Sequence, residues 1–524
     1  MKGKILLKYV LLAMLIAAVT VSAAASGQSS GPTAPAGKKS FSILLEQFGA
    51  APMPPDIDPN NNKWVNILKK ELPDIDINWI ITPAGQLQQR LNVMIGAGEP
   101  PDTFPMTMSQ MIQWADQGII QPLDSLLKNS YKNINNFLVE EDLKPTKYNN
   151  HSYGIMVPNN RLENPQTMVI RTDWLENLGL QPPKTIDQFY NVLHAFTFKD
   201  PDRNGKNDTY GIAGVTNFNY LWQVFGMFGV QHSDSWFSKI GNQIIPDIIR
   251  PEMKEAVAFL AKLYKEGILD KDTLNMGGPQ LEEKAVRGLI GVWSFASWGI
   301  SIRHIPNLKK NYPNAKVDLL IPPPAADGNI YTHLRRNGLR MFGVSSKCKY
   351  PETVVYYFNW IIEQDKSTLP IYRLNFDKMY LGELGRDSYI IGGKFQDVLP
   401  TNLLSPEAAL DMYRYAYRTH WGTIQSLPDD LLWEFSEIRV KEGIILPYFL
   451  EAQRFAAKYG RPNAAAVTGP VYAQYMTDIN TYWEETIAAI VTGSKPISAF
   501  DDFVKFFYAN GGQKVIDEVT AMNK

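Results

Sequence analysis

The sequence predicts an α/β protein, because two kinds of segment alternate along it. Short apolar runs, typical of buried strands, alternate along the chain with segments whose apolar residues recur at helical spacing. Such alternation is typical of parallel sheets that are covered by helices. The chain has 524 residues, of which 45% are hydrophobic and 20% are charged. This length and composition fit a soluble globular protein of about two or three domains.

The N-terminus is expected to direct export. Three early lysines precede an apolar run, residues 9–21, and the small residues Ala23–Ala25. This arrangement predicts a secretory signal peptide over residues 1–25, with an uncleaved anchor as the alternative. Residues 26–38 are rich in Gly, Ser, Pro and Ala and predict a flexible tether. The protein is therefore expected to be secreted and to work outside the cell or at the cell surface (in the periplasm, if the cell is Gram-negative).

Cysteine content and charge exclude several classes of protein. Ala24 stands where the lipidated cysteine of a bacterial lipoprotein box would be, which argues against a lipid anchor. The single cysteine, Cys348, lies far from this point and excludes an intramolecular disulfide or a CxxC site. The formal net charge is −1 and the chain has no basic tract, so nucleic acid is not an expected partner.

Strands and helices alternate in the following order. Strands are predicted at residues 39–48, 76–81, 102–106, 210–215, 288–295 and 338–346. Helices are predicted at residues 63–72, from Pro83 to Gly96, through 111–114, from Thr185 to Phe196, at 250–267 and at 351–362. From Ser405 onward the pattern is mostly helical. The last firm helix has Phe500, Phe503 and Phe507 on one face and ends at Gly511.

The loop DPDRNGKND, residues 200–208, carries the strongest motif. Oxygen-bearing side chains occupy its first, third, fifth and ninth positions, glycine its sixth, and a backbone carbonyl its seventh: Asp200, Asp202, Asn204, Asp208, Gly205 and Lys206. This spacing is that of the first part of an EF-hand loop, whose hard oxygen ligands suit Ca²⁺. Gly211 replaces the closing Glu at the twelfth position, so a structural ion is expected and not a sensor site. The alternative is a solvated turn rich in Asp and Asn.

Several segments resemble the extracellular solute-binding proteins of bacterial ABC importers, in particular those that bind carbohydrate. They are residues 90–104, 151–160, 171–212, 349–362 and 485–515. The central segment is the most specific, and it is similar to alginate-oligosaccharide-binding proteins and to long binding lipoproteins of Gram-positive bacteria. In that family the DP-x-x-N-G-K-x-D loop binds calcium. Thr209 stands here where the alginate-type proteins place Glu, so one ligand of the ion stays unassigned.

The resemblance implies a two-lobed, periplasmic-binding-protein-like fold with a hinge, an interlobe cleft and a helical C-terminal region. Lobe 1 is expected at residues 39–165 and 300–345, and lobe 2 at residues 166–299 and 346–524. The implied function is that of a monomeric substrate-binding component of an ABC transporter. Such a component captures an oligosaccharide, with a uronic-acid oligosaccharide as one option, and delivers it to permease subunits in the membrane.

Ligand contacts are predicted near strand ends, because sugars stack on aromatic rings and bind planar polar groups. The predicted ligand-binding residues are Trp222, Trp293, Trp298, Trp421, Arg335, Phe48 and Asn159. Trp293 and Trp298 flank the end of a predicted strand, where the resemblance implies an aromatic residue that stacks on sugar. Arg335, next to Arg336, suits a ligand carboxylate. Core packing is the alternative for each tryptophan, and a solvated surface pair is the alternative for the arginines.

A secreted glycoside hydrolase or polysaccharide lyase is the competing function. Such an enzyme needs two facing carboxylates or a placed base. The adjacent acids at 140–142 and 429–430 do not meet this need, because neighbouring side chains point to opposite or solvated sides. The G-x-S-x-G match at residues 27–31 lies in the tether and not on a strand-to-helix elbow. The sequence therefore predicts no catalytic residue and favours a binding protein.

Overall fold

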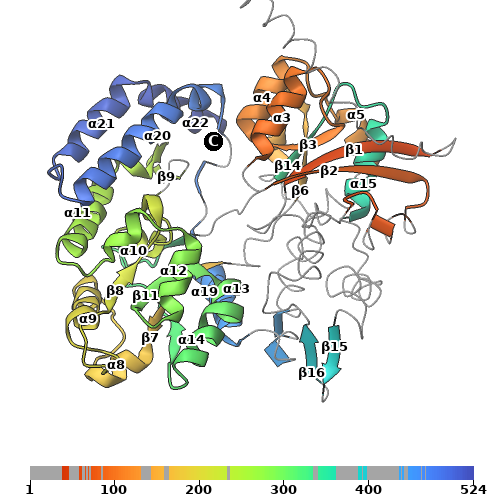
Figure 1. Cartoon of the computed structure of the whole chain (residues 1–524). Helices are drawn as coiled ribbons and strands as arrows, with labels where there is room; N and C mark the ends of the chain where they lie inside the picture. Colours follow the sequence, from red (N-terminus) through yellow and green to blue (C-terminus); the bar gives the residue numbers. More distant parts are fainter. Residues whose placement is uncertain are drawn as a thin grey trace, which may run out of the picture.

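A computed structural model shows two bodies, each with its own central sheet and apolar core (Figure 1). The body that contains the N-terminal strands is lobe 1, and the other is lobe 2. The structure describes residues 38–46, 58–61, 65–66, 69, 72–83, 86–130, 143–157, 165–232, 236–333, 340–361, 388–391, 394–397, 436–437, 440–441, 446–461, 463–465 and 468–523. Within these ranges, no helix is long and apolar enough to cross a membrane.

Lobe 1 contains a five-stranded sheet in the order β2-β1-β3-β14-β6. Its strands are β1 (Lys39–Glu46), β2 (Ile75–Thr82), β3 (Thr103–Met106), β6 (Gly154–Val157) and β14 (Arg340–Val344). The first three are parallel to one another, as the sequence predicts, whereas β14 runs antiparallel to β3 and to β6. Phe41, Ile43 and Leu44 are buried, so both faces of β1 are covered, as is usual for an interior strand of an α/β sheet.

Helices cover the lobe 1 sheet (Figure 1). They are α3 (Leu87–Gly96), α4 (Met108–Asp116), α5 (Asp124–Ser130) and α15 (Pro351–Ile361). A short turn and hairpin, η1 (Lys144–Thr146), β4 (Lys147–Tyr148) and β5 (His151–Ser152), precede β6. The ring of Tyr357 on α15 lies 5.6 Å from Phe41, and that of Phe358 lies 4.9 Å from Phe342. These contacts place α15 in the lobe 1 core.

Lobe 2 contains a four-stranded sheet in the order β12-β7-β11-β8. Its strands are β7 (Gln166–Arg171), β8 (Tyr210–Ala213), β11 (Ile290–Ala296) and β12 (Val317–Leu319). β11 runs antiparallel to β7 and parallel to β8. The other elements are α8 (Thr172–Leu178), α9 (Ile186–Phe198), η2 (Thr216–Phe218), α10 (Trp222–Gly226), β9 (Phe237–Ile240), β10 (Gln243–Pro246), η3 (Asp247–Ile249), α11 (Pro251–Lys265), η4 (Lys271–Leu274), α12 (Gly278–Val286), α13 (Ser297–Gly299), η5 (Ile300–His304), α14 (Ile305–Asn311) and α19 (Tyr448–Tyr459).

The predicted helix before the calcium-type loop is confirmed as α9. Its N-cap residue is Thr185, whose Oγ1 accepts a hydrogen bond from the backbone N–H of Gln188 over 3.2 Å. The side chain of Gln188 accepts from the N–H of Lys184 over 2.8 Å and not from that of Thr185, so the expected capping box is half formed. Phe189 and Phe196 are fully buried, as the helical spacing predicts.

Three helices at the end of the chain form what we call the C-terminal helical unit of lobe 2 (Figure 1). They are α20 (Pro470–Val491), α21 (Ala499–Ala509) and α22 (Gly512–Met522). The Trp483 ring packs 6.1 Å from Phe500 and 5.0 Å from Phe503. Gly511 joins α21 to α22 with a φ of 90°, a left-handed conformation that glycine adopts without a steric penalty. The predicted helix over 500–507 and its glycine stop are therefore confirmed.

The boundaries of the lobes differ from the sequence-based ones. Residues 317–319 belong to lobe 2, because β12 pairs with β7, although the sequence places 300–345 in lobe 1. Conversely, α15 packs in lobe 1, although the sequence places 346–524 in lobe 2. The periodicity of an apolar segment shows that it packs against a core but not which core. A parallel bridge between β13 (Thr332–His333) and β17 (Gly460–Arg461) ties the segment that returns to lobe 1 to the end of α19.

Candidate functional site

Three aromatic side chains meet at the carboxyl end of β11: Phe295 of the strand itself, Tyr220 of the loop before α10, and Trp222 at the start of α10. We call them the aromatic cluster. The ring of Tyr220 lies 5.0 Å from that of Phe295 and 5.3 Å from that of Trp222. Trp222 is buried, whereas Tyr220 and Phe295 are half-buried and keep part of their surface accessible. Strand ends of this kind border ligand sites in α/β proteins. The cluster is therefore the candidate ligand-binding surface of lobe 2.

The backbone that presents Tyr220 is strained. Asn217, Phe218 and Tyr220 have φ values of 58°, 55° and 64°, in the left-handed region that bulky residues rarely adopt. Each such residue costs about 1–3 kcal/mol and persists only where its surroundings hold it. His232 helps to do so, because its Nε2 donates to the carbonyl oxygen of Asn217 over 2.7 Å. Strain of this kind concentrates at ligand sites, which supports a functional role for residues 217–220.

A buried layer of polar groups lies behind the aromatic cluster. The side chain of Gln223, on α10, donates from Nε2 to the backbone oxygen of Gln166 over 2.9 Å and accepts from the hydroxyl of Ser294 over 3.0 Å. Gln223 and Ser294 are both fully buried. These bonds join the first residue of β7, the helix α10 and the end of β11. They fix the cluster to the start of the lobe 2 sheet, where the chain arrives from lobe 1.

A second network lies beneath Phe295 and starts in η5, which is a π-helix, a form that is frequent at functional sites. The imidazole of His304, fully buried, accepts at Nδ1 from the indole Nε1 of Trp293 over 3.1 Å. Its ring lies 4.5 Å from that of Phe295. The Oε2 atom of Glu282 lies 3.4 Å from His304 Nε2 and 3.1 Å from Nη2 of Arg303.

Burial sets the ionisation of this network. Burial lowers the pKa of His304 below its ordinary value, and the neighbouring carboxylate of Glu282 offsets only part of this effect. Burial also disfavours the charged form of Glu282, but contact with His304 and with the Arg303 guanidinium outweighs it and leaves the pKa of Glu282 lowered. Near neutral pH the network therefore contains a neutral imidazole and a carboxylate that is paired with Arg303.

The structure places three of the predicted tryptophans near the end of β11. Trp293 is fully buried and bonded to His304, so its ring belongs to the core in this structure. Trp222 lies in the aromatic cluster behind Tyr220. Trp298 is half-buried and its ring lies 5.9 Å from that of Phe449 on α19. A ligand-binding role for each of the three stays a prediction.

The other predicted contacts, Trp421, Arg335, Phe48 and Asn159, lie outside the described residues and also stay predictions. Sequence reasoning missed Tyr220 and Phe295, the two half-exposed rings of the cluster. Both stand within aromatic runs that it singled out for their tryptophans, NFNYLWQVF and GVWSFASWG. A signal for these rings was therefore present in the sequence. The left-handed backbone at Tyr220 left none, because neither glycine nor a turn motif marks it.

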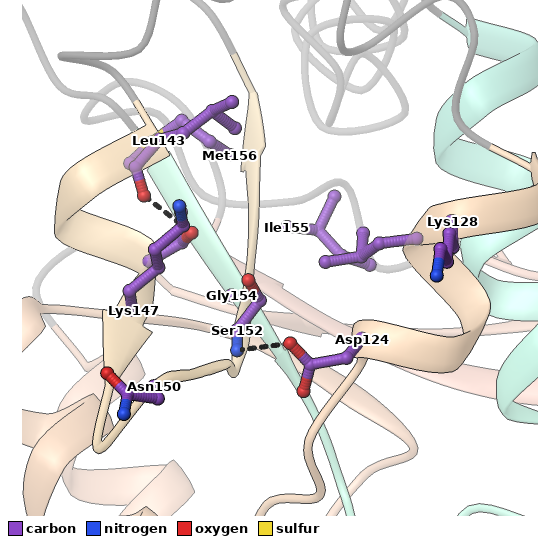
Figure 2. Close-up of a pocket in the computed structure, with 11 residues that line it drawn as sticks. Asp124, Lys128, Leu143, Lys147, Asn150, Ser152, Gly154, Ile155 and Met156 are labelled. Carbon is purple, nitrogen blue, oxygen red and sulfur yellow. Dashed lines mark hydrogen bonds between the residues drawn. The ribbon is translucent and has the colours of Figure 1, made fainter.

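A pocket of about 440 Å³ lies in lobe 1, beside the outer strand β6 (Figure 2). It is lined by Asp124, Leu127, Lys128, Leu143, Thr146, Lys147, Asn150, Ser152, Gly154, Ile155 and Met156. Asp124 closes one side, since its carboxylate accepts from the N–H of Ser152 over 3.1 Å and lies 3.0 Å from Nδ1 of His151. Burial opposes ionisation of Asp124, but the bonds to His151 and Ser152 keep its pKa lowered. The pocket lies in lobe 1, whereas the aromatic cluster lies in lobe 2, and the pocket lining mixes apolar, polar, anionic and cationic groups.

The calcium-type loop, residues 200–208, folds as a compact turn. The carboxylate of Asp200 accepts from the backbone N–H groups of Asn204 and Gly205, each over 3.0 Å. The side-chain amide of Asn204 donates to Asp202 over 2.8 Å and to Asp208 over 3.2 Å. Gly205 has a φ of 75°, which agrees with the sharp turn expected at the sixth position. Two of the predicted donors, Asp202 and Asp208, thus bond the Asn204 amide, whereas Asp200 bonds the backbone of the turn.

The donor set fits a cation, although its carboxylates are not drawn together. In the part of the chain that the structure describes, no group of three or more His, Cys, Asp or Glu side chains is arranged to hold a metal ion. However, the Oδ1 atom of Asp202 is buried and has no hydrogen-bond partner. Burial, together with the nearby carboxylates of Asp200 and Asp208, raises the pKa of Asp202. A buried acceptor among like charges is the environment that a bound cation would stabilise.

Comparison with known proteins gives a family match over most of lobe 1 and lobe 2. Residues 54–366, more than half of the chain, match the family described as bacterial extracellular solute-binding protein. The lipoprotein LipO of Bacillus subtilis is 30% identical over 289 residues, which are 54% of this chain and 55% of LipO. The polygalacturonan/rhamnogalacturonan-binding protein YtcQ of the same organism is 29% identical over 241 residues, 45% of this chain and 46% of YtcQ. The chain therefore spans about half the length of these relatives.

Solved structures share the fold. The crystal structure of the alginate-binding protein AlgQ2 without calcium ion matches with a TM-score of 0.62 and 19% identity, covering 92% of this chain and 97% of AlgQ2. The Streptococcus pneumoniae substrate-binding protein FusA in complex with kestose matches with a TM-score of 0.67 and 18% identity, covering 92% and 98%. A further FusA structure is of an EF-hand mutant. At these identities the likeness establishes the fold alone, and it confirms the periplasmic-binding-protein-like architecture predicted from the sequence.

Proposed function

The chain belongs to the family of bacterial extracellular solute-binding proteins, and on this basis we propose that it is the substrate-binding component of an ABC importer. It captures an oligosaccharide between its lobes and delivers it chemically intact to permease subunits in the membrane. The names of the relatives support this role, since YtcQ is named as a polygalacturonan/rhamnogalacturonan-binding protein and the FusA structure holds kestose. None of these proteins is named as an enzyme, which agrees with the absence of a catalytic assignment in the sequence.

The observation that carries the proposal is the aromatic cluster. A sugar ring has apolar C–H faces, and half-exposed aromatic rings provide flat surfaces on which such faces stack. Tyr220 and Phe295 offer such surfaces at a strand end, with Trp222 behind them. The cost of the left-handed backbone at Tyr220 is explained if ligand binding requires the ring at that point.

Closure of the lobes completes the site in this proposal. Ligand binding shifts the balance between open and closed forms only as far as the ligand prefers the closed form. We assign Trp298 to the rim of the site and Trp293 to its support. The remaining predicted contacts, Trp421, Arg335, Phe48 and Asn159, are proposed to reach the ligand on closure.

Whether the site can bind a negatively charged ligand depends on whether it contains a cationic side chain that is not already paired with a carboxylate of the protein. Arg303, beside the aromatic cluster, is paired with Glu282 over 3.1 Å, so this part of the site suits a neutral ring. A uronic-acid unit requires another cation, and Arg335 is the residue that we propose for this role. The ligands named for the relatives, polygalacturonan or rhamnogalacturonan for YtcQ and kestose for FusA, differ in this respect.

A structural Ca²⁺ ion is part of the proposal. The side chains of Asp200, Asp202, Asn204 and Asp208 and the carbonyl of Lys206 would hold it, and the ion would supply the positive charge that these carboxylates lack. The buried Oδ1 of Asp202 without a partner supports this assignment. So do the descriptions of the AlgQ2 structure, as lacking calcium ion, and of a FusA EF-hand mutant.

We also propose that the protein acts as a monomer outside the cell. Residues 1–25 serve as the export signal and residues 26–38 as a tether in this view. Residues 1–37 lie outside the described part of the chain, so both assignments rest on composition. The permease is the expected partner, and mass spectrometry of the mature protein would test the cleavage site and the absence of a lipid.

The test is calorimetry with trigalacturonate, rhamnogalacturonan fragments, alginate trisaccharide and kestose, followed by chromatography of the recovered ligand. Binding of one of these with the ligand unchanged supports the proposal. Breakdown of the ligand would instead support the glycoside hydrolase or lyase alternative. Phe295→Ala should weaken binding at least about tenfold, because a stacked ring contributes on the order of 1.4 kcal/mol or more. Tyr508→Ala, at an exposed position of α21, is the matched control and should bind normally.

A further inference from the structure

We propose that His304 is a positioning residue for the aromatic cluster: its neutral imidazole maintains the binding geometry, and its protonation in acid makes ligand capture fail. The inference rests on the proposed function for its binding readout and on the geometry beneath Phe295 for its mechanism. His304 does not line the cluster but supports it from below. It acts through Trp293 and Phe295, which leads to a pH dependence that a purely structural residue would not produce.

The hydrogen bond from Trp293 determines the tautomer of His304. An indole nitrogen can only donate, so the His304 Nδ1 atom, 3.1 Å from Trp293 Nε1, must accept and carries no proton. The proton of the neutral ring is therefore on Nε2, which faces the carboxylate of Glu282 at 3.4 Å. The imidazole thus forms a link between β11, where Trp293 is hydrogen-bonded to it, and α12, where the Glu282 carboxylate lies near Nε2 without a hydrogen bond to it.

Phe295 lies directly against this link. Its ring is 4.5 Å from that of His304, and the guanidinium of Arg303 lies 5.7 Å from its centroid. Arg303 and His304 are consecutive residues of the π-helix η5, and Glu282 contacts both. A change in the orientation of His304 therefore displaces the surface on which Phe295 rests and the cation beside it.

Protonation breaks the arrangement. A charged imidazole carries a proton on Nδ1 as well, so two donors, His304 Nδ1 and Trp293 Nε1, would face each other at hydrogen-bond distance. The charged groups that face the ring are Glu282 from α12 and Arg303 from η5. The Glu282 carboxylate favours the imidazolium and Arg303 opposes it, while burial lowers the pKa of His304 overall. The binding geometry should therefore persist at neutral pH and be lost in acid, below the ordinary histidine value of 6.5.

The first experiment needs no ligand. In protein labelled with ¹⁵N in tryptophan, the indole N–H signal of Trp293, assigned with Trp293→Phe, is followed between about pH 8 and pH 5. It should shift as His304 gains a proton and stay fixed in His304→Gln, whose amide accepts the same bond without titrating. His151→Gln, which alters an exposed histidine of lobe 1, is the control and should leave the shift as in the wild type.

The second experiment measures binding of trigalacturonate by calorimetry over the same range of pH. The ratio of wild-type to His304→Gln affinity cancels any titration of the ligand, and it should fall at least about tenfold from pH 8 to pH 5. A constant ratio together with a fixed Trp293 signal would overturn the inference. If trigalacturonate binds at no pH, the proposed ligand class fails but the Trp293 signal still decides the role of His304. If His304→Gln does not fold, Glu282→Gln replaces it, because loss of the carboxylate should move the Trp293 transition to lower pH.

Discussion

The aromatic cluster and the C-terminal helical unit both belong to lobe 2, but they are built in opposite ways. In the C-terminal helical unit the backbone is regular, and Gly511 occupies the left-handed position between α21 and α22. In the loop before the aromatic cluster, Asn217, Phe218 and Tyr220 adopt that conformation without being glycine. Behind the cluster, buried polar side chains bond one another or the backbone, as in the network of Gln223 and the network of His304.

The difference shows where the fold departs from local preference. A chain usually agrees with local rules where only stability is required and departs from them at functional sites. In the C-terminal helical unit, helix periodicity, glycine placement and aromatic packing all favour the same structure. Near the aromatic cluster, strain and buried polar groups are held in place by contacts from α10, α12 and η5. Substitutions in the first region should therefore change stability, and substitutions in the second should mainly change binding.

The largest effect on stability is expected for Trp483→Ala. Trp483 is 1% exposed and packs against Phe500 and Phe503, so its removal leaves a cavity and should lower the free energy of unfolding by about 3–5 kcal/mol. Urea unfolding measures this. Tyr508→Ala, on the exposed face of α21, should change stability by less than about 0.5 kcal/mol. An equal effect of both would mean that the packing of the C-terminal helical unit contributes little.

Calcium should produce the next largest effect. Ca²⁺ at about one hundred times its dissociation constant should raise the free energy of unfolding by about 2.7 kcal/mol, and EDTA should reverse this. Asp202→Ala should abolish the response and leave ligand preference unchanged. Differential scanning calorimetry with and without Ca²⁺ is the measurement. An identical melting temperature in protein shown to be free of metal would argue for a solvated turn.

The loop also gives a pH prediction with a defined sign. The pKa of Asp202 is raised in the fold, chiefly by burial and by the carboxylates of Asp200 and Asp208. Asp202 therefore keeps its proton to a higher pH in the folded state than in the unfolded state. In metal-free protein, the contribution of Asp202 to stability is then lost as pH rises above 3.8, the ordinary pKa. With Ca²⁺ present this loss should disappear, since the ion stabilises the ionised form. Melting curves with and without Ca²⁺ across the acid range test this.

Glu518→Gln should have an intermediate effect. The carboxylate of Glu518, on α22, accepts from three backbone N–H groups at the start of α20, those of Gly469 (3.2 Å), Val471 (2.8 Å) and Tyr472 (2.8 Å). A negative charge at a helix N-terminus is favourable, so its loss should cost about 1–2 kcal/mol in thermal unfolding. Glu485→Gln, at an exposed position within α20, is the control and should be neutral. Ligand affinity should not change in either variant.

The smallest effects on stability are expected at the strained loop, where binding separates two variants. Asn217→Gly removes the left-handed penalty and should change the free energy of unfolding by no more than about 1 kcal/mol, with binding retained. Tyr220→Gly relieves the same kind of strain but also removes a ring of the aromatic cluster, and should weaken binding at least about tenfold. Equal binding by the two variants would show that the cluster does not contact the ligand.

Much of the fold was predictable from the sequence because it depends on neighbours along the chain. The periodicity that marks α9 and α21, the glycine at position 511 and the spacing of Asp200–Asp208 are local properties, and local geometry follows from them. The candidate site was predictable only as a neighbourhood. The sequence pointed to Trp222, Trp293 and Trp298, whereas the cluster places the half-buried rings of Tyr220 and Phe295 in front of Trp222.

By itself the sequence determined an α/β protein with a calcium-type loop, a helical pattern at the C-terminus and a likeness to solute-binding proteins, and it predicted export. The tertiary structure alone decided that β12 joins lobe 2, that α15 joins lobe 1, and that His304 bonds Trp293 beneath Phe295. It also decided that the backbone at Tyr220 is left-handed. These features depend on contacts between residues far apart in the chain. Such contacts hold conformations that local preference opposes, so no short segment carries a sign of them.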